Sequence, residues 1–145
     1  MKRKRFIFIT LIAYIIFIFF LAVLSRESIK DTVKLDLFWG YRQPKGYTSR
    51  DNLLNIVCFI PIGLLVGLCS DKYRIVKAIL FGLLVSISIE FSQLIWHRGV
   101  FDVDDLFNNV LGTLIGGLIV VLFVMRLKRK AIDNRKDGTV SIGDS

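Results

Sequence analysis

The sequence predicts an all-α protein: an integral membrane four-helix bundle with both termini in the cytoplasm. The chain has 145 residues and is 54% hydrophobic, and its apolar residues are gathered into long runs. A transmembrane helix needs ~20 mainly apolar residues to cross roughly 30 Å of hydrocarbon. Four runs approach that length, and helices satisfy their own backbone groups in lipid. The predicted helices cover residues 6–24, 53–69, 75–94 and 106–125.

The first run follows four basic residues, Lys2 to Arg5, as the apolar part of a secretory signal would. It is longer than an ordinary signal core, however, and it ends in Ala22-Val23-Leu24 without a small-x-small cleavage pattern. We therefore expect an uncleaved membrane anchor, which makes this a multi-pass protein of the cell membrane.

Lysine and arginine residues set the predicted orientation. They cluster before the first run, at the second connection and after the last run, and an even number of spans places all three clusters on one side. The positive-inside rule makes that side cytoplasmic. The third connection carries Arg98 as its only Lys or Arg and is expected outside. The first connection has six Lys and Arg residues mixed with acids, and it carries the weakest signal.

Residues 1–130 are predicted to form a single domain, because four spans leave no room for another. Residues 131–145 are polar and lack apolar periodicity, so we expect a disordered cytoplasmic tail. The net charge of +8 lies mostly beside the membrane. It therefore indicates the lipid bilayer as a partner and no nucleic acid. Cys58 and Cys69 share one predicted helix about 16 Å apart and cannot form a disulfide with each other.

Polar side chains from separate runs converge at one depth in this topology. The second run enters from outside, the third ends outside and the fourth begins outside, so their polar residues meet near the outer surface. Ionisable groups inside apolar spans are costly and tend to be functional. The predicted outer-face binding cluster contains eight residues: Asn55, Glu90, Gln93, Arg98, Asp102, Asp104, Asp105 and Asn109.

Small residues recur at a spacing of four in the last three runs, and this pattern lets helices approach closely. Glu90 follows two of them at the same spacing, so it should face protein, and the stripe continues to Gln93 and His97 if the helix persists. We expect these three helices to pack together, with the first more peripheral and a kink at Pro61. The predicted packing residues are Pro61, Gly63, Gly67, Gly82, Ser86, Gly112 and Gly116.

Each polar group also has a structural interpretation. The three Asp residues can cap the fourth helix. Asn55 and Asn109 can act as interhelical hydrogen-bonding groups. Glu90 and Arg98, for which we predict a charge-assisted contact, can form a structural ion pair. His97 is the only histidine and is interpreted as an interfacial residue.

Three motifs together resemble the VanZ-like family, over roughly residues 52–125. They are Asn55-x-x-x-Phe59-Ile60-Pro61-Ile62-Gly63, Glu90-x-x-Gln93, and Arg98-x-x-x-Asp102-x-Asp104-Asp105-x-x-x-Asn109-x-x-Gly112. The resemblance implies a small bacterial membrane protein, and the family's namesake is linked to teicoplanin resistance. The first run, the first connection and the tail contain no matching motif.

The leading hypothesis is a non-enzymatic envelope protein without a cofactor. It would bind a cell-wall lipid precursor or a lipoglycopeptide at its outer face. This binding would lower the susceptibility of the cell to glycopeptides. The alternative is a metal-assisted membrane enzyme acting on a lipid phosphate or a cell-wall precursor. There Glu90 and the three Asp residues would bind Mg²⁺ or Ca²⁺ and Arg98 would bind the phosphate, although no nucleophile or base is evident. A transporter subunit is a third possibility.

Overall fold

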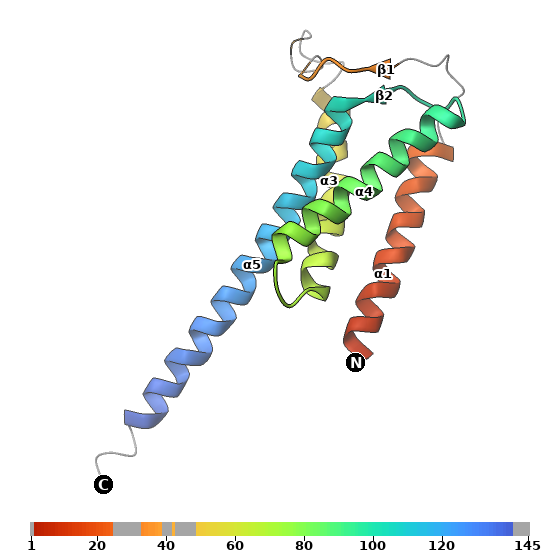
Figure 1. The fold of residues 1–145 in the computed structure, drawn as a ribbon. Helices are drawn as coiled ribbons and strands as arrows, with labels where there is room; N and C mark the ends of the chain where they lie inside the picture. The colour runs from red at the N-terminus through yellow and green to blue at the C-terminus, as the bar shows by residue number, and fades with distance from the viewer. Residues whose placement is uncertain (1, 25–32, 39–41, 43–48, 141–145) are drawn as a thin grey trace.

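Four long apolar helices form the fold, as the sequence predicts (Figure 1). The computed structural model describes residues 2–24, 33–38, 42 and 49–140. Within these ranges, four helices are long and apolar enough to cross a membrane. They are α1 (Lys2–Phe19), continued by the π-helical turn η1 (Phe20–Leu24), then α3 (Ser49–Cys69), α4 (Arg74–Ile95) and α5 (Val103–Val140).

The helices extend beyond the predicted apolar runs at their polar ends. The first turn of α3 contains Asp51, and that of α5 contains Asp104 and Asp105. Hydropathy marks only the part of a helix that lies in hydrocarbon, whereas acidic residues are favourable in a first turn because they interact with the helix dipole. The polar first turns therefore make these helices longer than the apolar runs that predict them.

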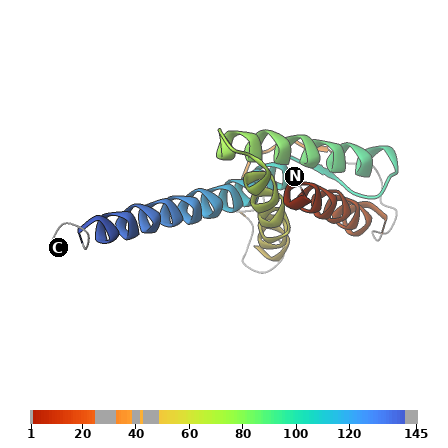
Figure 2. The same ribbon diagram turned by 90° about the horizontal axis from the view of Figure 1, so that it is seen from below.

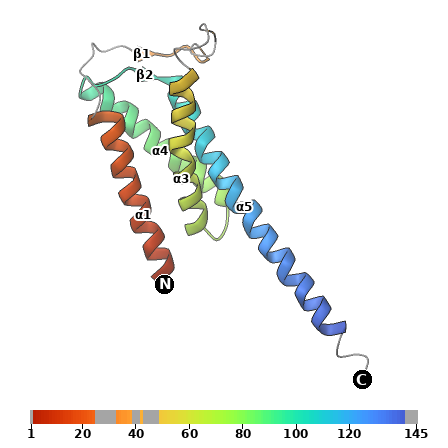
Figure 3. The same cartoon turned by 180° about the vertical axis from the view of Figure 1, so that it is seen from behind.

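The last helix continues through most of the segment for which a disordered tail is predicted. It ends at Val140, and Figures 1 and 3 show it projecting well beyond the other helices. Residues 126–131, which lead into the predicted tail, are all Arg, Lys, Leu or Ala, which have high helix propensity. They also extend a helix that is already nucleated, so each added residue needs no new nucleus. Residues 141–145 of the predicted tail lie outside the described residues.

Small residues lie where α3 and α4 meet α5. A Cβ atom on Gly112 would collide with the backbone carbonyl of Ile56, and one on Gly116 would collide with that of Ile60. Gly63 meets the backbone of Thr113 in the same way. These contacts place the α3 and α5 backbones against each other, which no larger side chain would permit.

The remaining predicted packing positions lie on the same surfaces. Gly67 faces Val120, and Gly82 faces the Thr113 side chain. Ser86 is fully buried and meets α5 through a hydrogen bond. Pro61 lies inside α3, where it supplies no backbone donor to the preceding turn.

The first helix is the least buried of the four spans. Seen from below in Figure 2, α1 and the far part of α5 lie on opposite sides of the bundle. The Tyr14 hydroxyl donates to the Cys58 carbonyl of α3 at 2.9 Å. Near the N-terminus, Lys4 forms an exposed ion pair of 2.6 Å with Asp71, in the connection between α3 and α4. The Lys4 ammonium, through this hydrogen bond and its charge, lowers the pKa of Asp71.

A short two-stranded sheet covers the other end of the bundle. Strand β1 (Val33–Lys34) pairs in parallel with β2 (Phe101–Asp102), where η1 and α4 end and α3 and α5 begin (Figure 1). The N-terminus, the α3–α4 connection and the end of α5 all lie away from this sheet (Figures 1 and 3). The described ends of the chain are therefore on one side, as an even number of spans requires.

Candidate functional site

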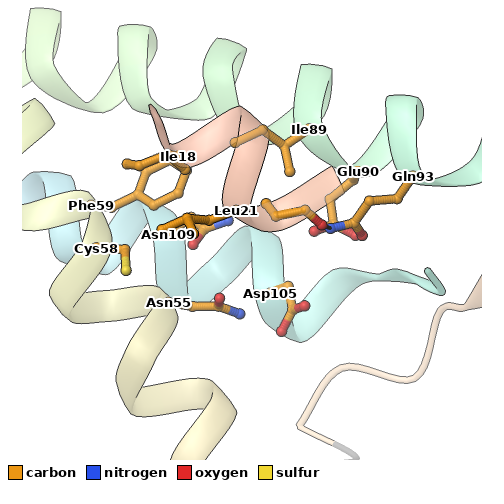
Figure 4. A pocket seen from close by; sticks show the side chains of 11 residues that line it. Ile18, Leu21, Asn55, Cys58, Phe59, Ile89, Glu90, Gln93, Asp105 and Asn109 are labelled. Atoms are coloured by element: carbon orange, nitrogen blue, oxygen red, sulfur yellow. Dashed lines mark hydrogen bonds between the residues drawn. The ribbon is translucent and has the colours of Figure 1, made fainter. Parts of the chain in front are cut away.

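A cavity of about 120 Å³ lies between the helices near the sheet-covered end. Eleven residues from all four spans line it, and five of them belong to the predicted polar cluster. Figure 4 shows these five side chains around one space: Asn55, Glu90, Gln93, Asp105 and Asn109.

Helix direction explains why these five residues meet. Asn55 lies near the start of α3 and Asp105 near the start of α5, with Asn109 one turn later. Glu90 and Gln93 lie in the last turns of α4, which runs in the opposite direction. Residues that are remote in sequence therefore lie at the same depth along the bundle. The sequence predicts this convergence from the directions of the helices.

The Glu90 carboxylate is almost completely buried, with 2% of the residue exposed. Its Oε2 atom accepts a hydrogen bond of 3.1 Å from the backbone N–H of Asp102. Arg98 donates through Nη1 to the backbone carbonyl of Leu24 at 3.1 Å. The Glu90–Arg98 contact stays a prediction, while these bonds show that each side chain also fixes the backbone of a neighbouring segment.

The end of α4 differs from the predicted stripe. The helix ends at Ile95, and His97 adopts a left-handed conformation with φ 51°. The N–H of His97 bonds to the Leu94 carbonyl at 3.3 Å, and the N–H of Arg98 bonds to the Gln93 carbonyl at 2.8 Å. This pair of bonds is a Schellman motif, which reverses the chain. His97 therefore ends the helix and does not continue the face that carries Glu90.

The first helix contributes more to the site than the sequence indicates. Gln93 donates through Nε2 to the Ala22 carbonyl at 2.9 Å, next to the bond from Arg98 to Leu24. The last carbonyls of a helix have no partner within it, so these donors attach the end of the first helix to α4 and to the connection that follows it. Ile18, Leu21 and Ala22 then line the cavity.

Sequence reasoning missed six lining residues, all apolar or weakly polar: Ile18, Leu21, Ala22, Cys58, Phe59 and Ile89. Cys58 and Phe59 follow Asn55 at three and four positions, so helical spacing could have placed them on its face. After its basic start the first helix is apolar except for Thr10 and Tyr14. Tyr14, whose hydroxyl bonds to α3, was the one signal that could have indicated the face that meets the protein.

Two of the three predicted Asp residues have structural roles beside the cavity. Asp102 directly precedes α5, and its Oδ1 atom accepts from the N–H of Asp104 at 2.9 Å, as an N-cap does. Asp104 is 2% exposed and accepts from the backbone N–H of Phe38 in the first connection. The Phe38 ring packs edge-on against Phe107. Asp102 therefore has the capping role that the structural interpretation gives to the Asp residues. Asp104 attaches the first connection to α5.

The ligand set of the metal-dependent alternative is not assembled in the described part of the chain. No three His, Cys, Asp or Glu side chains among those residues come together as metal ligands. Of the four proposed carboxylates, Glu90 and Asp105 line the cavity, whereas Asp102 and Asp104 do not.

Amide groups complete the buried polar surface. Asn109 donates through Nδ2 to Ser86 Oγ at 2.8 Å, joining α5 to α4. Its Oδ1 atom, like Oε1 of Gln93, is a buried acceptor that has no hydrogen-bond donor among the described residues. Gln93 Oε1 lies against Gly99, in the connection that follows α4.

Fold and site together define a small multi-pass membrane protein with a polar cavity at one end of its helix bundle. The chain belongs to the VanZ/LLP1 family, whose family model matches residues 6–124. It is similar to Protein VanZ of Enterococcus faecium, with 27% identity over 84 residues. That match covers 58% of this chain and about half, 52%, of the relative. No solved structure matches the chain significantly.

Proposed function

We propose that this protein acts in the bacterial cell membrane, with cytoplasmic termini and the cavity near the outer face. There it alters how cell-wall or lipid ligands interact with the outer surface of the membrane, and this lowers susceptibility to teicoplanin-type glycopeptides. Membership of the VanZ/LLP1 family over residues 6–124 carries the proposal. The Lys and Arg clusters at the end away from the cavity support the orientation.

The size of the cavity supports an indirect effect on the antibiotic. At about 120 Å³ it is smaller than a drug-sized pocket, which usually measures roughly 300–1,000 Å³. It admits a small group that belongs to a larger molecule, such as part of a membrane lipid or a lipid-linked cell-wall precursor. A whole glycopeptide is too large, so the proposed ligand is a component of the envelope.

The test is susceptibility in a bacterial host that lacks this protein. Expression of the chain should raise the minimal inhibitory concentration of teicoplanin, relative to an unrelated four-helix membrane protein at the same membrane level. A glycopeptide without an acyl chain serves as a second comparison, because a protein that acts at the membrane should affect the acylated drug more. Unchanged teicoplanin susceptibility at confirmed membrane levels would reject the proposal.

A further inference from the structure

We propose that a groove between α4 and α5, at the end of the bundle away from the sheet, binds the headgroup of an anionic phospholipid. The groove shares no lining residue with the cavity, so this inference goes beyond the proposed function. The shape of the groove, the basic residues near it and the apolar surface that continues from it support the proposal.

The groove has a volume of about 250 Å³ and lies where the α3–α4 connection leads into α4. It is lined by Asp71, Tyr73, Arg74, Ile75 and Val76 on that side and by Val121 of α5. One turn before Val121 the two helices are in contact, since a Cβ atom on Gly117 would lie 3.6 Å from the Cα atom of Ile75. The groove therefore lies where α5 continues past the start of α4 (Figure 1).

Basic residues from three segments lie at this end of the bundle. Lys4 brings the first segment to the groove, because it pairs with Asp71 of the lining. Lys4 has the largest effect in lowering the pKa of Asp71, and Arg74 and Lys77 lie close enough to add to it. The carboxylate of the lining is thus already compensated, and the surrounding charge favours an anion. The three segments contribute Lys2, Arg3, Lys4 and Arg5, then Lys72, Arg74 and Lys77, and finally Arg126, Lys128, Arg129 and Lys130.

Three exposed lysines are assigned to the headgroup. Lys72 lies in the connection and Lys77 in the second turn of α4. Lys128 follows Val121 by seven residues, which places it two turns later on the same face of α5. Arg74 has a structural role, because its Nη1 atom donates to the Gly67 carbonyl at the end of α3.

An apolar stripe that continues from the groove favours a lipid over other anions. Val76 lines the groove and is 53% exposed, and Leu80 and Leu84 follow at a spacing of four with 61% and 62% exposed. This stripe runs along a helix that can span the membrane. Acyl chains can therefore lie against it while the phosphate meets the lysines, as juxtamembrane basic residues attract anionic headgroups. A free phosphate ion or a nucleic acid would gain nothing from an apolar surface inside the hydrocarbon.

The first experiment measures thermal unfolding of the full chain in a neutral detergent at constant ionic strength. Dioleoyl phosphatidylglycerol should raise the unfolding temperature and reach saturation, because a ligand that binds the native state stabilises it. Three probes should give no saturable shift: dioleoyl phosphatidylcholine, which has the same acyl chains and no net charge, sodium phosphate, and a DNA duplex. An equal shift with any of the three, or no shift with phosphatidylglycerol, would overturn the proposal.

Charge variants assign the binding to this end of the bundle. Lys77→Gln and Lys128→Gln should each require about fivefold more phosphatidylglycerol for half-saturation, the size expected for one lysine near a membrane surface. Arg42→Gln removes an exposed charge from the first connection and should bind as the wild type does. Identical half-saturation in the wild type and both lysine variants would also overturn the proposal.

A second pair of variants tests the groove without changing any charge. Val121→Phe places a larger side chain in the groove, whereas Leu122→Phe adds the same ring at the neighbouring position, which is 59% exposed. Val121→Phe should abolish the saturable shift with phosphatidylglycerol, and Leu122→Phe should retain it. Val76→Phe fills the groove from α4 and keeps the test decisive if Val121→Phe does not fold. Wild-type binding by a folded groove variant would show that the basic residues bind lipid without the groove, which would overturn the proposal.

Discussion

Individual polar side chains divide into two groups around the cavity. Five of the predicted eight line it, whereas Arg98, Asp102 and Asp104 hold the neighbouring backbone through hydrogen bonds. Depth and helical spacing could bring the five together, because a helix fixes the direction of its side chains. Depth and helical spacing could not show that the other three residues lie outside the lining. Their positions depend on the Schellman turn at His97, which redirects the connection and which hydropathy does not predict.

Asp102 provides a residue-level test of capping. Asp102→Asn should leave stability nearly unchanged, because Asn and Asp are equally good N-caps, whereas Asp102→Ala should cost about 1 kcal/mol. Denaturant unfolding in detergent measures both. If Asp102 instead stabilises the protein through its charge, Asp102→Asn should lose as much stability as Asp102→Ala. That result would contradict the capping role.

The ion pair between Lys4 and Asp71 predicts a pH effect. Because Lys4 lowers the pKa of Asp71 in the folded protein, the pair stabilises the fold above the carboxyl's ordinary value of 3.8. That contribution is lost as the pH falls through the lowered value, and it should be small and salt-sensitive because both groups are exposed. An NMR titration of Asp71 should show its midpoint rising in Lys4→Gln. An unchanged midpoint would mean that the pair does not form in solution.

At the scale of helices, apolar length predicted the four spans because the hydrocarbon core sets a minimum length. It could not locate their ends, since polar turns such as the one containing Asp51 lie beyond the hydrocarbon. Apolar length also could not orient the first helix, because it does not indicate which face, such as the one carrying Tyr14, meets the other helices. Ala22 contributes to the site through its backbone carbonyl, which accepts a hydrogen bond from Gln93. Every residue has such a carbonyl, so the amino-acid sequence does not indicate which one is used. Strands of two residues, such as β1, leave no detectable alternation.

Close contact between α3 and α5 predicts that Gly112→Leu will be strongly destabilising. Leucine would have to displace the backbone at Ile56, and overpacking of this kind typically costs about 1–3 kcal/mol or more. Ala13→Leu, at an exposed position of α1, is the matched control and should change little. The measurement is the unfolding temperature of each variant in detergent. Equal temperatures for Gly112→Leu and wild type would show that the two helices do not meet at this glycine.

At the scale of the whole molecule, both described ends of the chain lie away from the two-stranded sheet, near which the cavity lies (Figure 1). The even number of spans requires this common side, and the Lys and Arg distribution predicts that it is cytoplasmic. The fold alone does not distinguish the two orientations, because a bundle packs identically in either direction. Orientation therefore depends on charge outside the helices.

Cysteine labelling tests the orientation. In a background with Cys58→Ser and Cys69→Ser, Leu35→Cys places an exposed thiol at the cavity end and Asp71→Cys places one at the opposite end. A membrane-impermeant maleimide added to intact cells should label Leu35→Cys at once and Asp71→Cys only after the membrane is disrupted. The reverse order would place the cavity at the cytoplasmic face.

The most direct test of the central claim is glycopeptide susceptibility in cells that express Glu90→Gln at a membrane level equal to that of the wild type. Glu90 is buried in the lining, and the substitution preserves its shape while removing its charge. We predict that Glu90→Gln loses the protection given by the wild type, whereas Asp51→Asn, an equal change of charge outside the cavity, keeps it. Full protection by Glu90→Gln at normal levels would contradict the claim that this cavity is the functional site.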